Sequence, residues 1–320
     1  MHVSTLEWGI TVGVTLAVLL VDVGIIAVRP HEPTFRECAI ALALYVGFAV
    51  VFGLWVWQHH GGEYGLQFFA GWLTEYSLSV DNLFIFLIIM ASFRVPRARQ
   101  QEALLVGIVL ALVFRAVFIG LGAVAIARFS WIFYLFGLFL IYTAARLIKD
   151  TEHEDDAQNA IVRLVQRHYR LAGHWDGGLK LFVNENGLRL LTPMALVIVA
   201  LGTTDVLFAL DSIPAIYGLT SEPYLVLTAN IFALMGLRQL YFLLGDLLKR
   251  LVFLSQGLAI LLAFIGVKLI LHALHENELA FINGGNHVNV PEISIGVSLG
   301  VIVGTLAATA VASLWRTRRA

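Results

Sequence analysis

Cysteine, methionine and charged residues are all scarce in this chain of 320 residues. The single cysteine, Cys38, excludes an internal disulfide, a cysteine-rich zinc site and a Cys-x-x-Cys redox pair. Four methionines provide too few thioethers for a Cu(I) pathway. Lys, Arg, Asp and Glu make up 13% of the chain, against roughly 25% in soluble domains. There is also no basic patch of the kind that follows nucleic acid.

Sequence motifs of the common membrane enzymes are missing as well. The chain has no Walker motif (GxxxxGK[ST]), so it does not hydrolyse ATP by that route. It has no HExxH zinc site, and no pairing of a nucleophile with a base stands out. We therefore expect a protein that is not an enzyme and that holds no cofactor.

Apolar residues dominate instead, at 59% of the chain with a mean hydropathy of +0.84. Runs of about 20 apolar residues, each long enough to cross a bilayer, recur along the whole length. This pattern predicts an all-α polytopic membrane protein, with residues 1–320 forming one transmembrane domain. The expected spans are nine: 5–28, 36–57, 66–91, 103–126, 131–149, 191–217, 223–246, 252–272 and 293–315.

Basic residues fall mainly in the loops that follow every second span, and in the C-terminal tail. By the positive-inside rule, the N-terminus is predicted outside and the C-terminus in the cytoplasm. Residues 150–190 then form a cytoplasmic loop and 273–292 an extracytoplasmic one. In the cytoplasmic loop we expect a helix around 160–170 and, at the Asn186-Gly187 pair, a short β-hairpin.

Four carboxylates lie inside the expected spans, in two copies of one pattern. The copies are TEYSLSVDN (74–82) and TDVLFALDS (204–212), each of the form Thr-acid-x5-Asp followed by an amide or a hydroxyl. A charge at this depth costs on the order of 3 kcal/mol or more, so it usually serves an ion or a proton. The candidate metal ligands are Glu75, Asp81, Asn82, Asp205, Asp211 and Ser212.

The repeat continues beyond these carboxylates. Residues 107–115 (GIVLALVFR) align with 230–238 (NIFALMGLR), which places Arg115 on Arg238. Residues 142–148 (YTAARLI) align more weakly with 264–270 (FIGVKLI). Spans 3–5 and 6–8 thus form an inverted 3+3 repeat, an arrangement typical of secondary transporters.

The candidate ligands are hard oxygens, which favour Mn²⁺, Mg²⁺ or Ca²⁺ over copper or zinc. Pro214 adds to them by freeing the carbonyl of Leu210. Four acids and the two repeated arginines sum to −2, the charge that one divalent ion or two protons would balance. Arg115 and Arg238 are expected to pair with acids and so to hold helices together, whereas the four acids are expected to serve an ion. Asn82 and Ser212 are equally suited to hydrogen bonding across helices.

Four longer stretches resemble the TerC family of bacterial membrane proteins, which includes the pH-regulated Alx-type members. They are FFAGWLTEYSLSVDNLFIF (68–86), TPMALVIVALGTTDVLFALDSIPAI (192–216), NIFALMGLRQLYFLL (230–244) and FINGGNHVNVPEIS (281–294). The resemblance implies a multi-pass protein of the bacterial cytoplasmic membrane, grouped with LysE-like transporters, that exports Mn²⁺. It also implies a link to tellurite resistance and places Glu75, Asp81, Asn82, Asp205 and Asp211 in the family's acidic motifs.

The leading hypothesis is therefore a secondary transporter that exports a divalent metal, most simply Mn²⁺, in exchange for protons. Its partners would be the cation, protons and the lipid bilayer, without nucleic acid. Ca²⁺ is the alternative substrate because it takes the same oxygen ligands. The alternative function is a membrane scaffold or stress-signalling component of tellurite resistance, in which the acids are structural.

Overall fold

The computed structural model describes residues 1, 3–28, 34–129, 131–149, 172, 175, 180–185, 188–244, 252–277, 279 and 282–319. The side chains of some helical residues, Asp81 among them, lie outside this description, and so does the helix expected at 160–170. The described elements are α1 (Thr5–Val28), α2 (Phe35–His60), α3 (Gly62–Ser92), α4 (Arg97–Arg128), α5 (Ile132–Lys149), β1 (Phe182–Glu185), β2 (Leu188–Leu191), α7 (Pro193–Tyr217), α8 (Pro223–Met235), α9 (Leu237–Leu244), α10 (Leu254–His275), the short 3₁₀ turn η2 (Asn283–Gly285) and α11 (Ile295–Arg319).

Long apolar helices make up almost all of this part of the chain, which confirms the expected all-α membrane class. Within the described residues, seven helical stretches are long and apolar enough to cross a bilayer. Two further expected spans correspond to α1 and α5, whose apolar stretches, Thr5–Val18 and Ile132–Ile148, are shorter.

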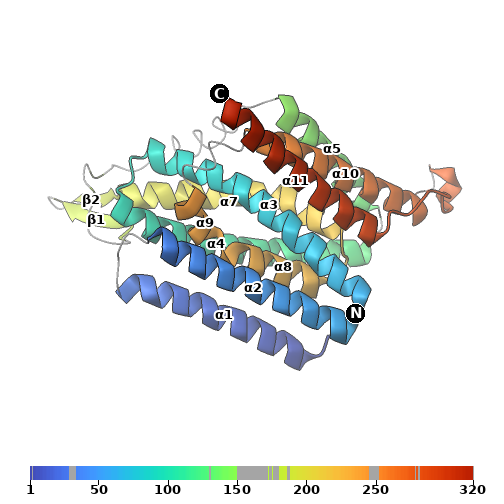
Figure 1. Cartoon of the computed structure of the whole chain (residues 1–320), viewed down its shortest axis with the longest axis horizontal. Coiled ribbons are helices and arrows are strands. Elements are labelled where there is room, and N and C mark those ends of the chain that lie inside the picture. Colours follow the sequence, from blue (N-terminus) through green and yellow to red (C-terminus); the bar gives the residue numbers. More distant parts are fainter. Residues whose placement is uncertain are drawn as a thin grey trace.

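The helices form a bundle with α3, α4, α7 and α8 at its centre (Figure 1). In it α3 packs against α8 and α4 against α7. The pair α1 and α2 lies along one side, and α5, α10 and α11 along the other (Figure 1). Large apolar side chains on α1, α2, α4 and α11 remain exposed, as expected for surfaces that face lipid.

Two contacts fix the register between α3 and α7. The hydroxyl of Thr220, just beyond α7, donates to Oε1 of Gln67 at 2.7 Å. One turn further along α3, a Cβ built on Gly71 would lie 3.2 Å from Cδ1 of Ile216. As the residue number rises by four on α3 it falls by four on α7, so the two helices run antiparallel.

α5 and α10 cross with their backbones in contact, at Gly137 and Gly266. A Cβ added to either glycine would lie 2.8 Å from the carbonyl oxygen of the other. The flanking contacts are reciprocal too, since Gly137 faces Ile270 and Gly266 faces Ile141. Only glycine permits so close an approach, and the contact has a local twofold character.

The span expected at 223–246 is present as Pro223–Leu243, with an irregular turn at Gly236, where α8 ends and α9 begins after one residue. A Cβ at Gly236 would lie 2.9 Å from Cδ1 of Leu42 and 3.3 Å from the hydroxyl of Tyr76. The glycine thus allows α2 and α3 to approach the chain here. It also weakens the helix at this point, which accounts for the break that the hydropathy pattern does not reveal.

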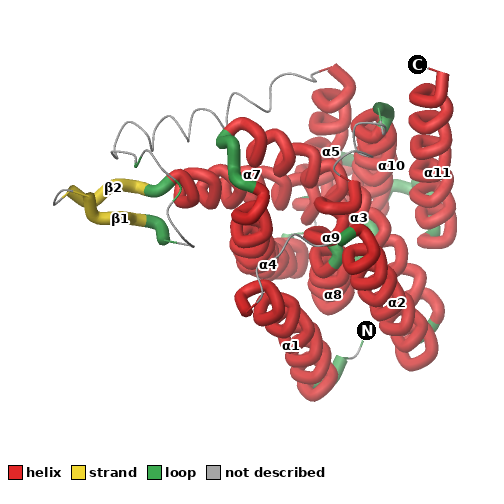
Figure 2. Tube along the Cα trace, turned by 60° about the vertical axis from the view of Figure 1, so that its left-hand side comes forward, coloured by secondary structure: helices red, strands yellow, loops and turns green. Residues whose placement is uncertain are grey.

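A two-stranded hairpin precedes α7 (Figure 2), at the place where the Asn-Gly pair predicts one. Its strands pair antiparallel from Phe182 opposite Leu191 to Glu185 opposite Leu188. Thr192 joins the hairpin to the helix, because its hydroxyl donates to the carbonyl of Lys180 at 2.7 Å and accepts from the amide of Ala195 at 3.1 Å. Thr192 is thereby the N-cap of α7.

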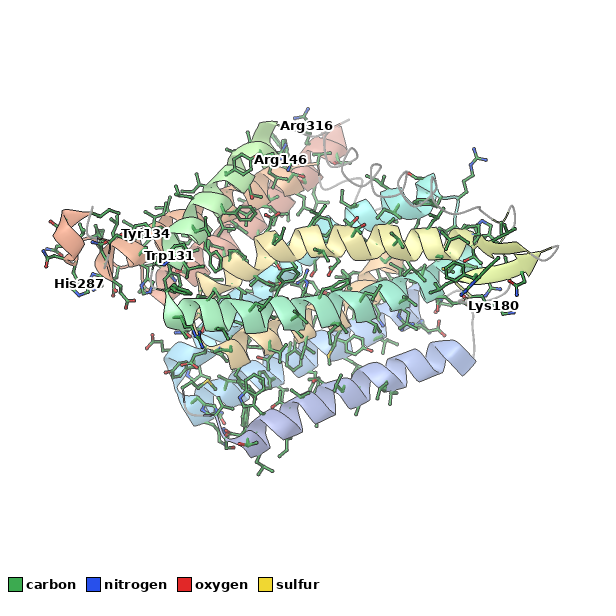
Figure 3. All side chains as sticks on the ribbon, turned by 180° about the vertical axis from the view of Figure 1, so that it is seen from behind. Trp131, Tyr134, Arg146, Lys180, His287 and Arg316 are labelled. Carbon is green, nitrogen blue, oxygen red and sulfur yellow. The ribbon has the colours of Figure 1, made fainter. Side chains whose placement is uncertain are left out.

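Three labelled basic side chains lie away from the loop that follows α10. Figure 3 shows Arg146 of α5 and Arg316 of α11 toward one edge of the bundle, and Lys180 beside the hairpin. His287 lies at the far end of the molecule, with Trp131 and Tyr134 toward the same end (Figure 3). These three cations are therefore separated from His287 along the bundle.

Candidate functional site: a buried ion cluster between the two repeats

Arg115 of α4 links the first acid of each repeat at the centre of the bundle. Its Nη1 forms a short hydrogen bond to Oε2 of Glu75 on α3 and donates to Oδ1 of Asn230 on α8 at 2.8 Å. Its Nε lies 3.9 Å from Oδ1 of Asp205 on α7, an ion pair without a hydrogen bond. Four different helices therefore supply one polar cluster.

The cluster is sealed from both ends of the bundle. Glu75, Arg115 and Asp205 are 0%, 1% and 2% exposed. Two apolar clusters flank them, one built on the α3–α4–α7–α9 side and one on the α2–α3–α7–α8 side. Tyr76 and Leu112, close to Glu75 and Arg115 in sequence, pack against both. The charged groups thus lie in an occluded position between two apolar barriers.

Several polar atoms of the cluster have no hydrogen-bond partner among the described residues. They are Oε1 of Glu75, Nε and Nη2 of Arg115 and Oδ2 of Asp205. Buried polar atoms are normally satisfied, and an orphaned one costs about 1–3 kcal/mol. A purely structural ion pair would be expected to satisfy these polar atoms. The unsatisfied atoms can therefore bind a further cation, proton or water.

The α3–α7 register places the other candidate ligands at two levels. Gly71 on α3 contacts Ile216 on α7, and the two helices run antiparallel. Glu75, four residues after Gly71, is therefore level with Ser212, four residues before Ile216. Asn82, eleven residues after Gly71, is level with Asp205 in the same way. Each acid is thus level with the amide or hydroxyl of the other copy of the acidic pattern. Asn82 and Ser212 are 6% and 1% exposed, and the hydroxyl of Ser212 has no partner among the described residues.

Asp211 occupies a different place, toward α5. The hydroxyl of Thr143 on α5 donates to its Oδ1 at 3.1 Å, and the carboxyl is only partly buried. Leu207 and Leu210 on the same part of α7 are 45% and 43% exposed. Asp211 is therefore the more accessible acid of the second repeat, while Asp205 is enclosed.

The backbone of Asp81 is helical, within α3, and its side chain lies outside the described residues. Arg238 is at the start of α9, beyond the break, where the side-chain amide of Gln239 accepts from its Nη2 at 3.0 Å. The two repeated arginines thus lie in different settings. Among the described residues, no group of three or more His, Cys, Asp or Glu side chains is arranged to hold a metal ion.

Asn230 and Thr143 are polar residues of the site that sequence reasoning missed. Both lie in segments used for the repeat alignment, where they were compared only as parts of apolar stretches. A buried amide within an apolar run was the available signal for Asn230. Thr143 carries no such signal, because a threonine inside a membrane helix usually bonds its own backbone.

Comparison with known proteins identifies the family of the chain. The model of the integral membrane protein TerC family matches residues 60–320. The chain belongs to the TerC family. The match covers every helix from α3 onward, and therefore the whole ion cluster of this TerC protein, while α1 and nearly all of α2 lie outside it.

Relatives of this TerC protein span almost its whole length. An uncharacterized membrane protein of Mycobacterium tuberculosis is 47% identical over 99% of this chain and 81% of its own length. One of Myxococcus xanthus is 38% identical, over 98% and 93%. A protein of Escherichia coli with the provisional name of membrane-bound redox modulator Alx is 35% identical, over 98% and 95%. No solved structure gives a significant match.

Proposed function

We propose that this TerC protein is a secondary transporter that exports Mn²⁺ across the cytoplasmic membrane in exchange for protons. One observation carries the proposal: Glu75 and Asp205, the first acids of the two repeats, lie together with a single arginine in a closed site at the centre of the bundle. Carboxylates at such depth are costly and typically mark ion or proton pathways.

The chemistry of the site supports a hard divalent cation. Glu75 and Ser212, and Asn82 and Asp205, lie at two levels of the α3–α7 register and offer carboxylate, amide and hydroxyl oxygens. Such oxygen donors suit Mn²⁺, with Ca²⁺ as the alternative substrate. Because Arg115 is bonded to Glu75 and Asn230, binding of the ion to Glu75 requires the guanidinium to move aside.

An inverted repeat explains how such a site would open to alternate sides, and we propose that α3–α5 and α7–α10 form one. The reciprocal contact of α5 with α10 supports it, because an inverted pair must meet itself across a twofold axis. The contact matches Gly137 with Gly266 and Ile141 with Ile270. This register differs by seven residues from the alignment of 142–148 with 264–270, and it is the one we adopt.

The separation of charges along the bundle supports the orientation expected from the sequence. Arg146, Lys180 and Arg316 would face the cytoplasm, and His287 would lie outside (Figure 3). The occluded cluster would then accept its ion from the cytoplasm near the hairpin end of α7 and release it near the end that carries Tyr217.

The test is metal flux in proteoliposomes, followed with a Mn²⁺-quenched dye and a pH dye together. We expect Mn²⁺ movement with an opposing proton signal in the wild type, and loss of both in Asp81→Asn and Asp211→Asn. Glu276→Gln is the matched control, because it removes a carboxylate from the outer end of α10, where the side chain is 54% exposed. Equal loss in the control, or no flux of Mn²⁺ by folded wild type, refutes the proposal.

A scaffold or signalling role is the competing function. The name of the Alx relative from Escherichia coli suggests redox modulation as a third possibility. One cysteine in the chain excludes an internal dithiol couple. A scaffold keeps its stress phenotype when Asp211→Asn folds normally, whereas a transporter loses it. The phenotype of cells that express this variant at wild-type levels therefore separates the two functions.

A further inference from the structure

Arg115 is held in the cluster through a single nitrogen of its guanidinium group. Nη1 donates to Oε2 of Glu75 and to Oδ1 of Asn230, whereas Nε and Nη2 have no hydrogen-bond partner among the described residues. An arginine side chain carries several N–H donors and often pairs with a carboxylate through two of its nitrogens. A guanidinium that only joins helices would be expected to use more of these donors. Arg115 is therefore easier to release from Glu75 than an arginine in a two-nitrogen pair.

The two oxygens that hold Nη1 come from different helices and are both buried. Asn230 on α8 is 2% exposed, and the nitrogen of its side-chain amide donates to the carbonyl of Val226 at 3.0 Å. Because that bond engages the amide nitrogen on its own helix, the amide oxygen is directed toward Nη1 of Arg115. A carboxylate oxygen and an amide oxygen thus face one point, which a positively charged N–H group now occupies. Oxygens of these two kinds are ligands of hard divalent cations.

Two further oxygens belong to the same level of the bundle. Oε1 of Glu75 and the hydroxyl of Ser212 have no hydrogen-bond partner among the described residues, and Ser212 on α7 is level with Glu75. A Cβ added to Gly71, one turn before Glu75, would lie 3.2 Å from Ile216 of α7 and 3.6 Å from Ala229 of α8. The helices α3, α7 and α8 therefore meet here, and each supplies an oxygen at this level.

Asp205 offers the guanidinium a second partner. Its Oδ1 lies 3.9 Å from Nε of Arg115, and its Oδ2 has no hydrogen-bond partner among the described residues. Nε and Nη2, the two nitrogens of Arg115 without a partner, lie on one edge of the guanidinium and can form two parallel hydrogen bonds with a carboxylate. A shift of the guanidinium toward Asp205 would free Glu75 and Asn230 while the buried cation stays paired.

We propose that Arg115 occupies the place of the transported ion in this closed state, and that Asn230 is a ligand of that ion. A divalent cation would replace Nη1 between Glu75 and Asn230, with Ser212 at the same level, while the guanidinium moves to Asp205. The protein could then close on a cation of its own when no metal ion is bound. That this ion is transported rests on the proposed function, whereas the competition between the ion and the guanidinium does not.

Electron paramagnetic resonance tests the competition on purified protein without any transport, because the sharp signal of free Mn²⁺ is lost when the ion binds. Arg115→Met should bind Mn²⁺ at least about tenfold more tightly than the wild type, the factor that one charge-assisted hydrogen bond corresponds to. Asn230→Leu should bind it at least about tenfold more weakly, since loss of even an outer partner of a metal site costs that much. Arg99→Met is the matched control and should bind like the wild type, because Arg99 pairs with Glu102 at the partly exposed start of α4.

The direction of the change in Asn230→Leu distinguishes a ligand from an anchor of the arginine. If Asn230 only held Arg115, its removal would loosen the guanidinium, and Mn²⁺ would bind as tightly as before or more tightly. Either result overturns the role of Asn230 as a ligand. Equal affinity of folded Arg115→Met and the wild type overturns the competition. If Arg115→Met does not fold, Asn230→Leu decides, because Nη1 is bonded to the very oxygen that the ion would use.

The flux assay on the same proteins separates this inference from the transport function. The expected changes in affinity without Mn²⁺ flux by the wild type support the competition and refute transport. Flux by the wild type together with unchanged affinity in both variants contradicts the competition and leaves transport supported. If neither the wild type nor folded Arg115→Met binds Mn²⁺, both ideas are wrong.

Discussion

Arg115→Met is the variant for which the structure makes its sharpest prediction. Methionine keeps much of the length of the side chain but removes the cation that pairs with Glu75 in the cluster. Breaking a buried pair by deleting one member costs about 3–5 kcal/mol, because the remaining charge stays desolvated. For a chain of this size that corresponds to a fall of roughly 4–7 °C in the unfolding midpoint.

The chain has a built-in reporter for this measurement. Cys38 is its single cysteine and is 3% exposed, so a thiol-reactive fluorescent dye labels it only as α2 opens. Thermal unfolding can thus be followed in detergent without introducing a probe. Arg99→Met is the matched control, since the pair of Arg99 with Glu102 is partly exposed and such pairs contribute about 0–1 kcal/mol.

A repair variant completes the test. Adding Glu75→Gln to Arg115→Met removes the stranded carboxylate and should restore most of the lost stability, since a neutral buried site can be as stable as a charged one. The reasoning is refuted if Arg115→Met unfolds at the same temperature as Arg99→Met. It is equally refuted if the double variant is less stable than Arg115→Met.

Three further variants probe other parts of the structure. Gly266→Ala should lower the free energy of unfolding by about 1–3 kcal/mol, because its Cβ would press on the facing backbone. Gly300→Ala, with open space around it, should leave that free energy unchanged or raise it by up to about 1 kcal/mol. Thr143→Val removes the hydroxyl that donates to Asp211 and should reduce Mn²⁺ flux while costing only about 0.5–1.5 kcal/mol; unchanged flux would remove Asp211 from the pathway. Asn230→Leu removes an acceptor of the buried guanidinium and should cost about 1–3 kcal/mol by the cysteine-labelling assay, and an unaltered midpoint would contradict the geometry of the cluster.

The sequence predicted the class of fold, since that class depends on strong local signals. Long apolar runs leave few alternatives to membrane helices, and acids within them must find a partner such as Arg115. The residues at which α5 and α10 contact each other could not be predicted from the sequence, because similar apolar segments align almost equally well one or two turns apart. The contact of Gly137 with Gly266 depends on backbone geometry that no hydropathy pattern encodes.

Arg238 shows a second property that could not be predicted from the sequence. Alignment placed it on Arg115, and identical residues in two repeats invite identical roles. The break at Gly236 depends on how closely α2 and α3 approach, which is a tertiary property, and it places Arg238 on a separate short helix. Among the described side chains, Arg115 is the arginine that pairs with Glu75 and Asp205, which the alignment alone does not reveal.

The hairpin and α7 form one stiff unit, because Thr192 bonds both Lys180 in the approach to β1 and the first turn of the helix. Asp205 lies thirteen residues beyond this junction, about 20 Å along an uninterrupted helix. Because this stretch of α7 is continuous, a displacement of the hairpin would be transmitted to the carboxyl of Asp205. A small element outside the helical bundle is thus connected mechanically to the buried cluster.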